Sequence, residues 1–181
     1  MDENERELKI SIFKVQHMLD WIKTKMYLDA NSEKAKSRIV RRGEVYQCNF
    51  GIGIGSEMQK ERPCVIIQGN VGNLNSSNVI VAPITHTLKP IPSMASITTQ
   101  KDENGLIILD GHVNLSNIQT VSKARLGKYI TKLSKQDIEN INFSLYISLG
   151  LIKNINKYEN KIDNLKKYIE KLKQNNLYSC E

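Results

Sequence analysis

Hydrophobic spacing changes twice along this chain, and the two changes limit the folds that it can adopt. Between residues 5 and 29, apolar side chains recur every three or four positions, which is the spacing of one face of a helix. Residues 41–133 instead contain short apolar runs with period-two spacing, separated by glycine, proline and asparagine. Helical spacing returns from residue 134. The sequence therefore predicts an α+β protein in which helices flank a central β domain.

The central zone holds several short apolar runs that are candidate strands. These runs are 44–50, 64–69, 78–84, 94–99, 105–110 and 117–122. The connections at 69–78 and 100–105 are polar and contain glycine and asparagine, as loops do, and the second is typical of a hairpin connection. Short strands at such close spacing favour a small antiparallel barrel.

A helix is predicted directly after the barrel, over residues 134–149. Ser134 is a suitable N-cap, and the carboxylate of Asp137 is favourable near a helix start. Gly150 is one possible end of this helix. The alternative is a helix that continues through Gly150, because apolar residues keep a heptad spacing over residues 151–172.

The terminal stretches 5–29 and 152–174 each carry an apolar stripe that neither can bury alone. We expect them to pair antiparallel as a coiled coil, either within one chain or across a dimer. The alternative is that both helices pack on the barrel. The expected organisation is an N-terminal helix and connector at 1–40, a central domain at 41–151 and a helical extension at 152–181.

Composition restricts the partners and the compartment. With 26 Lys and Arg against 19 Asp and Glu, the net charge of +7 favours a polyanionic partner, and a merely soluble surface explains it equally well. Cys48, Cys64 and Cys180 form no CxxC pair, so neither a zinc knuckle nor a disulfide framework is indicated. The acidic N-terminus is unlike a signal peptide, and no apolar run has the length of a membrane span. We expect a cytoplasmic protein without a membrane partner.

Two predicted strand ends offer a fixed cation and a hydroxyl. Arg62 precedes Pro63, which restricts it to an extended backbone. Thr85 directly follows the run 78–84. An arginine is always charged and grips phosphate oxygens with two bonds, and a threonine hydroxyl can bind a phosphate oxygen or orient a 2′-hydroxyl. The pair suits phosphodiester cleavage without a metal, whereas a surface arginine and a strand-end threonine are the simpler interpretation of each residue alone.

His86 directly follows Thr85. Histidine is the side chain best suited to acid–base catalysis at neutral pH, and the alternative is an exposed loop residue.

Several motifs occur in order along the central domain. They are Arg41-Arg42-Gly43-Glu44-Val45-Tyr46, Gly55-Ser56-Glu57 with Arg62-Pro63 and the strand after it, Val79 to Thr85, Asn117 to Val121 with Lys123-Ala124-Arg125-Leu126, and Ile147 to Leu151. Together they resemble the MazF/PemK (Kid) family of toxin endoribonucleases over about residues 41–151.

The resemblance implies an SH3-like antiparallel barrel of the CcdB/MazF type and a homodimer. It also implies a toxin of a type II toxin–antitoxin system, which cleaves single-stranded RNA at short sequences without a metal or another cofactor, and which has a cognate antitoxin as partner. The family's catalytic roles fall on Arg62 and Thr85. Glu57 is expected to orient Arg62 or the loop before it. The full set of expected supporting or RNA-binding residues is Ser56, Glu57, Gln59, His86, Asn117 and Gln119.

The late strand departs from the family pattern, which has an acidic residue, then glutamine and, two residues later, arginine. Ser116, Asn117 and Gln119 stand at these places, so the family's usual RNA target does not carry over. Two other functions remain open. The same barrel supports gyrase-directed toxins and non-catalytic interaction modules, because a fold does not settle an activity. An RNA processor without an antitoxin would carry the same residues.

Overall fold

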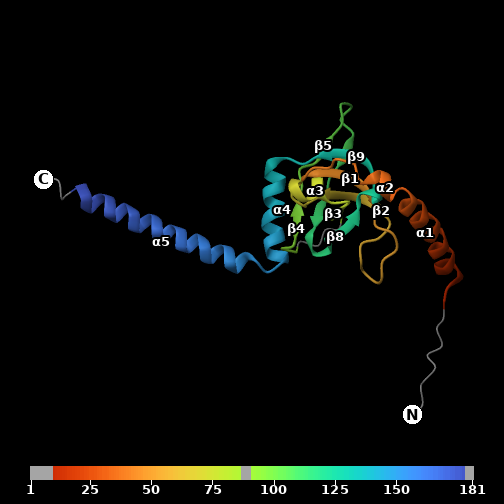
Figure 1. Cartoon of the computed structure of the whole chain (residues 1–181), viewed down its shortest axis with the longest axis horizontal. Coiled ribbons are helices and arrows are strands. Elements are labelled where there is room, and N and C mark those ends of the chain that lie inside the picture. Colours follow the sequence, from red (N-terminus) through yellow and green to blue (C-terminus); the bar gives the residue numbers. More distant parts are fainter. Residues whose placement is uncertain (1–9, 87–90, 178–181) are drawn as a thin grey trace, which may run out of the picture.

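The computed structural model describes residues 10–86 and 91–177 as an α+β fold (Figure 1). The helices are α1 (Ile12–Ala30), α2 (Ser32–Ala35), α3 (Asn70–Asn75), α4 (Lys135–Ser148) and α5 (Ile152–Leu177), with 3₁₀ turns η1 (Leu115–Asn117) and η2 (Lys123–Arg125). The strands are β1 (Glu44–Asn49), β2 (Glu61–Ile66), β3 (Asn78–Thr85), β4 (Met94–Ser96), β5 (Gln100–Lys101), β6 (Ile107–Leu109), β7 (His112–Asn114), β8 (Gln119–Ser122) and β9 (Leu126–Lys132). Within the described ranges, no helix is both long and apolar enough to cross a membrane.

Strand β3 organises the main sheet, which is antiparallel throughout. The hydrogen-bonded order is β4-β7-β3-β2-β1-β9, and β8 pairs with the first half of β3. The last two residues of β3, Ile84 and Thr85, pair with Val113 and His112 of β7 instead. Two different strands therefore lie along one edge of β3, and its C-terminal end emerges beside β7.

The sheet does not close into the barrel that the sequence predicts. Its edge strands β4 and β9 do not pair with each other in the part of the chain that the structure describes. Side chains span the opening: Gln100 donates from Nε2 to the Lys132 carbonyl at 3.4 Å and accepts from the Thr131 hydroxyl. A β4 of three residues, followed by the separate β5–β6 hairpin, gives too short a ladder to reach β9.

Alternate residues of the central strands supply two apolar clusters, one on each face of the sheet. One cluster contains Val45, Val65 and Ala82 and is covered by α4, whose Ile141 is fully buried. The other cluster consists of Val40, Tyr46, Cys48, Phe50, Cys64, Ile66, Val79, Val81, Val121 and Leu126. Cys48 and Cys64 are thus core residues, as expected of small apolar side chains.

The boundaries of α4 confirm the predicted cap. The Ser134 hydroxyl accepts from the Asp137 amide, and the Asp137 carboxylate accepts in return from the Ser134 amide, which makes a capping box. Gly150 adopts φ +70° and its amide donates to the Ile147 carbonyl at 3.0 Å, so α4 ends there and α5 is a separate helix.

Several elements differ from the sequence prediction. Residues 70–75 form α3 rather than loop, and the second strand spans 61–66 rather than 64–69. Strands β7 and β9 were not predicted, because Gly111 and Gly127 interrupt the period-two pattern on which a prediction rests.

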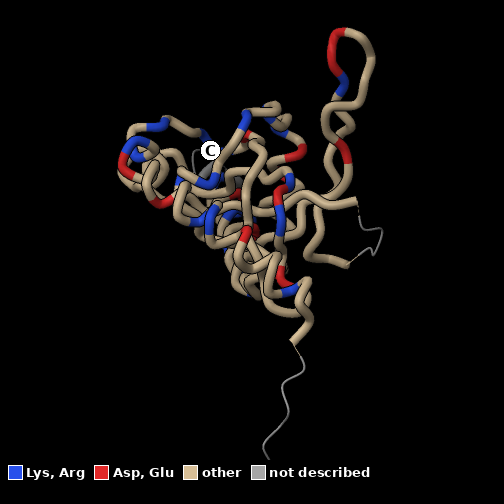
Figure 2. The backbone as a smooth tube through the Cα atoms, turned by 90° about the vertical axis from the view of Figure 1, so that its right-hand side faces the viewer, with Lys and Arg blue, Asp and Glu red and all other residues tan. Residues whose placement is uncertain are grey.

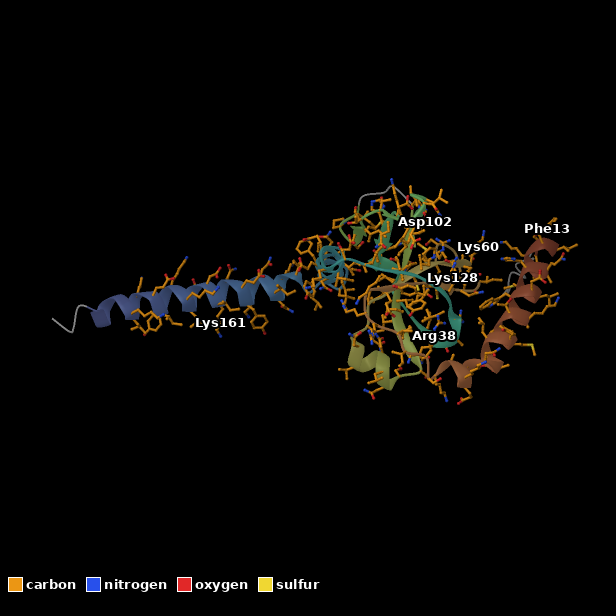
Figure 3. All side chains as sticks on the ribbon, turned by 90° about the horizontal axis from the view of Figure 1, so that it is seen from above. Phe13, Arg38, Lys60, Asp102, Lys128 and Lys161 are labelled. Carbon is orange, nitrogen blue, oxygen red and sulfur yellow. The ribbon has the colours of Figure 1, made fainter. Side chains whose placement is uncertain are left out.

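The terminal helices α1 and α5 extend from opposite sides of the β domain (Figures 1 and 3). The expected pairing of these helices within one chain is therefore wrong, and α5 does not pack on the sheet either. The apolar seam of α5 is exposed along its length, at Tyr158, Ile162, Leu165, Ile169 and Leu172. Residues 5–9 of the predicted N-terminal helix lie outside the described residues.

Trp21 attaches α1 to the β domain. Its indole lies so close to Gly51 that a Cβ at position 51 would be 2.4 Å from the ring atom Cζ2. The Arg125 guanidinium lies 5.3 Å from the centroid of the same ring and donates to the Asn49 carbonyl at 3.0 Å. Because residues 51–60 form the loop that precedes β2, α1 packs against the base of the loop that leads to Arg62.

Candidate active site

The loop at residues 51–60 positions the guanidinium of Arg62. The Phe50 amide donates to the Lys60 carbonyl at 2.9 Å and the Lys60 amide donates to the Gly51 carbonyl at 2.7 Å, which closes the base of the loop. Arg62 Nε donates to the Gln59 carbonyl at 3.1 Å, and its Nη1 lies 3.4 Å from the sulfur of Met58. The side chain is therefore held by the loop that folds over the start of β2.

Sheet register brings Thr85 to the same place as Arg62. Cys64 of β2 pairs with Pro83 of β3, so the same register continued by two residues sets Arg62 opposite Thr85. Both residues line one cleft of about 350 Å³ at this end of the sheet. Thr85 is 8% exposed, so its side chain forms part of the floor rather than the rim.

Asp110 and His86 lie in the same cleft and contact each other. His86 Nε2 is 2.5 Å from Asp110 Oδ1. Gly111 permits this approach, since it adopts φ +101° and a Cβ there would lie 2.6 Å from the Thr85 carbonyl oxygen. Sequence reasoning found His86 and missed Asp110, because residue 110 ends a different predicted strand and nothing local relates it to residue 86.

The remaining wall of the cleft is aliphatic. Ile107, Ile108 and Leu109 of β6 line it, together with Pro63 and Ile84. Ile107 and Ile108 are exposed although they are large and apolar. They belong to the β5–β6 hairpin, which stands clear of the rest of the domain, with acidic residues at its turn (Figure 2). Exposed apolar surface beside a cationic group is suited to a ligand that carries both flat rings and negative charge.

The other motif residues of the loop support the loop itself. Glu57 Oε2 accepts from the Ile54 amide at 2.9 Å, and Gln59 Oε1 accepts weakly from the Gly53 amide at 3.4 Å. Ser56 is exposed at the loop turn. Ser56, Glu57 and Gln59 are not among the described residues that line the cleft.

Asn117 and Gln119 lie apart from the cleft. Asn117 is the last residue of η1, and Gln119 of β8 pairs with Val81, four positions before Thr85. The lining residues of the cleft, as far as the chain is described, do not include either one. The structure therefore brings together Arg62, Thr85 and His86 from the predicted set, adds Asp110, and leaves Asn117 and Gln119 outside the described lining of the cleft.

The buried thiol of Cys64 on β2 is not suited to act as a nucleophile. The hydrogen bond with Cys48 and burial raise the pKa of the Cys64 thiol well above its usual range, so Cys64 stays protonated and is a poor nucleophile. Among the described residues, no cluster of three or more His, Cys, Asp or Glu side chains is arranged to hold a metal ion. Among the described residues, Arg62 forms an ion pair with no carboxylate, so its positive charge is available to a ligand.

Comparisons with known proteins match the central domain. Residues 41–149 match the family model described as "PemK-like, MazF-like toxin of type II toxin-antitoxin system". The chain is 37% identical over 118 residues to "Endoribonuclease MazF" of Staphylococcus saprophyticus, which covers 62% of this chain and 93% of that protein.

Two solved structures from mycobacterial species are similar to this fold. One is an endoribonuclease with a TM-score of 0.52 and 27% identity, covering 63% of this chain and 94% of that chain. The other is an endoribonuclease in complex with its cognate antitoxin, with a TM-score of 0.52 and 29% identity, covering 62% of this chain and 96% of that chain. The family match leaves α1 and α5 outside its limits.

Proposed function

This chain belongs to the PemK-like, MazF-like toxins of type II toxin–antitoxin systems, and on that premise we propose that it is an endoribonuclease that cleaves single-stranded RNA at short preferred sequences without a metal ion. Its partners are then the RNA substrate, a second copy of the chain and a cognate antitoxin, and it acts in the cytoplasm. The observation that carries the proposal is the cleft that Arg62 and Thr85 share.

Arg62 has the chemistry that the transition state requires. The 2′-hydroxyl attacks the neighbouring phosphorus, and the phosphorane that forms carries an additional negative charge. The guanidinium is permanently protonated and offers paired N–H donors to the phosphoryl oxygens. A single preorganised donor of this kind typically lowers the barrier by about 3 kcal/mol.

Thr85 would contribute a hydroxyl to the same phosphate or to the attacking 2′-hydroxyl. Its backbone is fixed by β7 on one side, through the pairing with His112, and by the close approach of Gly111. A buried and fixed hydroxyl loses little freedom when a substrate binds, which suits a group that orients the reacting atoms.

Purified protein is expected to cleave a long single-stranded RNA at equal rates in EDTA and in Mg²⁺, because neither proposed group requires a metal. Gel analysis of time courses in both buffers measures this. A Thr85→Val variant, purified in parallel, is expected to be slower by about tenfold to a hundredfold, the effect of losing one hydrogen bond to a charged group. That variant assigns the cleavage to this chain rather than to a contaminating nuclease. Activity that disappears in EDTA and returns with Mg²⁺ would contradict metal-free cleavage.

The antitoxin would compete with RNA for the same surface. The cleft combines a cation with exposed aliphatic side chains, and an extended acidic segment with apolar residues complements both. Lys and Arg are interspersed with Asp and Glu along the backbone that Figure 2 shows, and the net charge of +7 favours polyanionic partners.

The terminal helices would pair between two copies of the chain, α1 of one with α5 of the other. The sequence is compatible with two forms of this pairing, and pairing across a dimer is the one left once pairing within one chain is excluded. The apolar seam of α5 has isoleucine at 155, 162 and 169 alternating with Tyr158, Leu165 and Leu172, which is the heptad spacing of a two-stranded interface.

Replacing Ile162 and Leu165 with glutamate is expected to weaken self-association at least tenfold, because each charge would be buried at the helix pair. Sedimentation across a concentration series measures the change in dissociation constant. The control variant, Asn160→Glu with Lys167→Glu, adds glutamates on the outer face of α5 and should associate like the unaltered chain. Equal dissociation constants for the seam variant and the unaltered chain would rule out this role for α5.

A further inference from the structure

We propose that His86 is the general base of the cleavage reaction and that Asp110 is the residue that positions it. The proposal rests on the function proposed above and adds a proton-transfer group to the cleft. It concerns a histidine at a place to which the family motifs assign no catalytic role.

The first support is the geometry of the pair. His86 Nε2 and Asp110 Oδ1 are 2.5 Å apart, and both residues line the cleft that contains Arg62 and Thr85. The His86 side chain is 77% exposed and the Asp110 side chain is 37% exposed. The imidazole is thus open to a substrate, and the carboxylate is the less exposed member of the pair.

The second support is what the other lining groups cannot do. Arginine stays protonated at every ordinary pH and cannot accept a proton, and a threonine hydroxyl is a very weak base. The other described lining residues, apart from Asp110, are proline, isoleucine and leucine. His86 is therefore the one described lining residue that is suited to exchange a proton near neutral pH while facing the substrate.

The charged and titratable groups that the structure describes around His86 come from three segments. Arg62 reaches the cleft from β2, and Asp110 follows β6. His112 of β7 pairs with Thr85 but is not among the described residues that line the cleft, and its Nδ1 is buried. Arg62 and Asp110 thus place one positive and one negative side chain in the cleft that His86 lines.

The hydrogen bond decides which nitrogen reacts. When Nε2–H donates to the Asp110 carboxylate, Nδ1 carries the free lone pair, as the carboxylate of a catalytic triad fixes the tautomer of its histidine. The 2′-hydroxyl then gives its proton to Nδ1 as O2′ bonds to phosphorus, and the P–O5′ bond breaks. The leaving O5′ takes a proton from water. The imidazolium returns its proton to the hydroxide that remains, so the atoms and charges balance.

The main chain holds the histidine in place. Gly111 packs against the Thr85 carbonyl, and its would-be Cβ lies 3.5 Å from Cδ2 of the His86 ring. The turn that carries Asp110 therefore fixes the backbone before His86 as well as the imidazole itself.

The test is the pH dependence of cleavage by the full chain on a defined single-stranded RNA. The unaltered protein is expected to show kcat/KM rising with pH to a plateau, as a general base requires. His86→Ala is expected to lower the plateau by about 100-fold and to remove the rise, within the usual range for a lost general base. Asp110→Asn should lower the plateau of kcat/KM by about tenfold and move the rise of kcat/KM to lower pH. His17→Ala, on α1 and outside the cleft, should behave like the unaltered chain.

Chemical rescue separates a proton carrier from a packing residue. Added imidazole should restore part of the activity of His86→Ala, increasingly as pH rises and the free base accumulates. Rescue that increases as pH falls would show a general acid instead and overturn the proposal. Full activity of His86→Ala, or an unchanged pH profile, would also overturn it while leaving the nuclease function intact. An unaltered chain that cleaves no RNA would instead remove the proposed function itself. Thermal unfolding of each variant verifies that it is folded.

Discussion

Arg62→Ala is expected to lower kcat for RNA cleavage by about 10²-fold to 10³-fold, the largest effect of any single change in the cleft. The reason is that the guanidinium would stabilise charge that develops only on the phosphorane. KM should change much less, because a contact made mainly in the transition state contributes little to ground-state binding. Single-turnover rates on a defined single-stranded RNA separate the two parameters.

The conservative variant Arg62→Lys sharpens this expectation. Lysine keeps the charge but lacks the planar pair of donors, and it cannot reproduce the contact from Nε to the Gln59 carbonyl. The cleavage rate of Arg62→Lys should therefore fall between the rates of Arg62→Ala and the unaltered protein. The matched control is Arg41→Ala, which removes an exposed arginine at the opposite end of the sheet. Equal losses at both positions would mean that Arg62 contributes only general attraction for the RNA.

Asp137→Ala is expected to lower the free energy of unfolding by about 2–4 kcal/mol. Oδ1 of Asp137 accepts from the amide and hydroxyl of Thr98 at 2.9 and 3.0 Å. Oδ2 accepts from the amide and hydroxyl of Ser134 at 3.3 and 2.7 Å. One buried carboxylate thus joins the start of α4 to the segment after β4, and its removal leaves donors from both without a partner. Urea denaturation at pH 7 measures the loss, and Asp163→Ala on exposed α5 is the control.

The same carboxylate makes stability depend on pH. Burial alone would raise the pKa of Asp137, but hydrogen bonds from Ser134 and Thr98 outweigh burial and hold the pKa below its ordinary value. A pKa that is lower in the folded state adds stability above the unfolded value of about 3.9, and this stability is lost as pH falls through the folded value. The difference in the free energy of unfolding between the unaltered chain and Asp137→Ala should therefore shrink below about pH 4. A difference that grows in acid would contradict this sign.

Local signals predicted those parts of the fold that depend on neighbours in sequence. Ser134 and Asp137 specify the start of α4 because a capping box involves residues only three apart. Gly150 marked a possible end of α4 because the glycine that ends a helix is also a local signal. In contrast, α3 contains three asparagines and a glycine, which are typical of turns, and it forms where tertiary contacts override that preference.

Contacts between distant segments could not be predicted in this way. Arg62 and Thr85 were placed together only through the family motifs, since 23 positions separate them and the pairing of β2 with β3 is what joins them. Asp110 reaches His86 through the geometry of β6 and β7, which local spacing does not encode. The period of α5 defined an apolar face but not its partner, because a heptad pattern is the same whether the second helix comes from this chain or another.

The contact between Trp21 and Gly51 ties the evolution of two segments together. Position 51 has no room for any side chain while the indole is present, and its φ of +82° already disfavours every other amino acid. A lineage could acquire a larger residue there only after, or together with, a smaller one at position 21. Helix α1 lies outside the family match, yet it now restricts which sequences the loop before Arg62 can adopt.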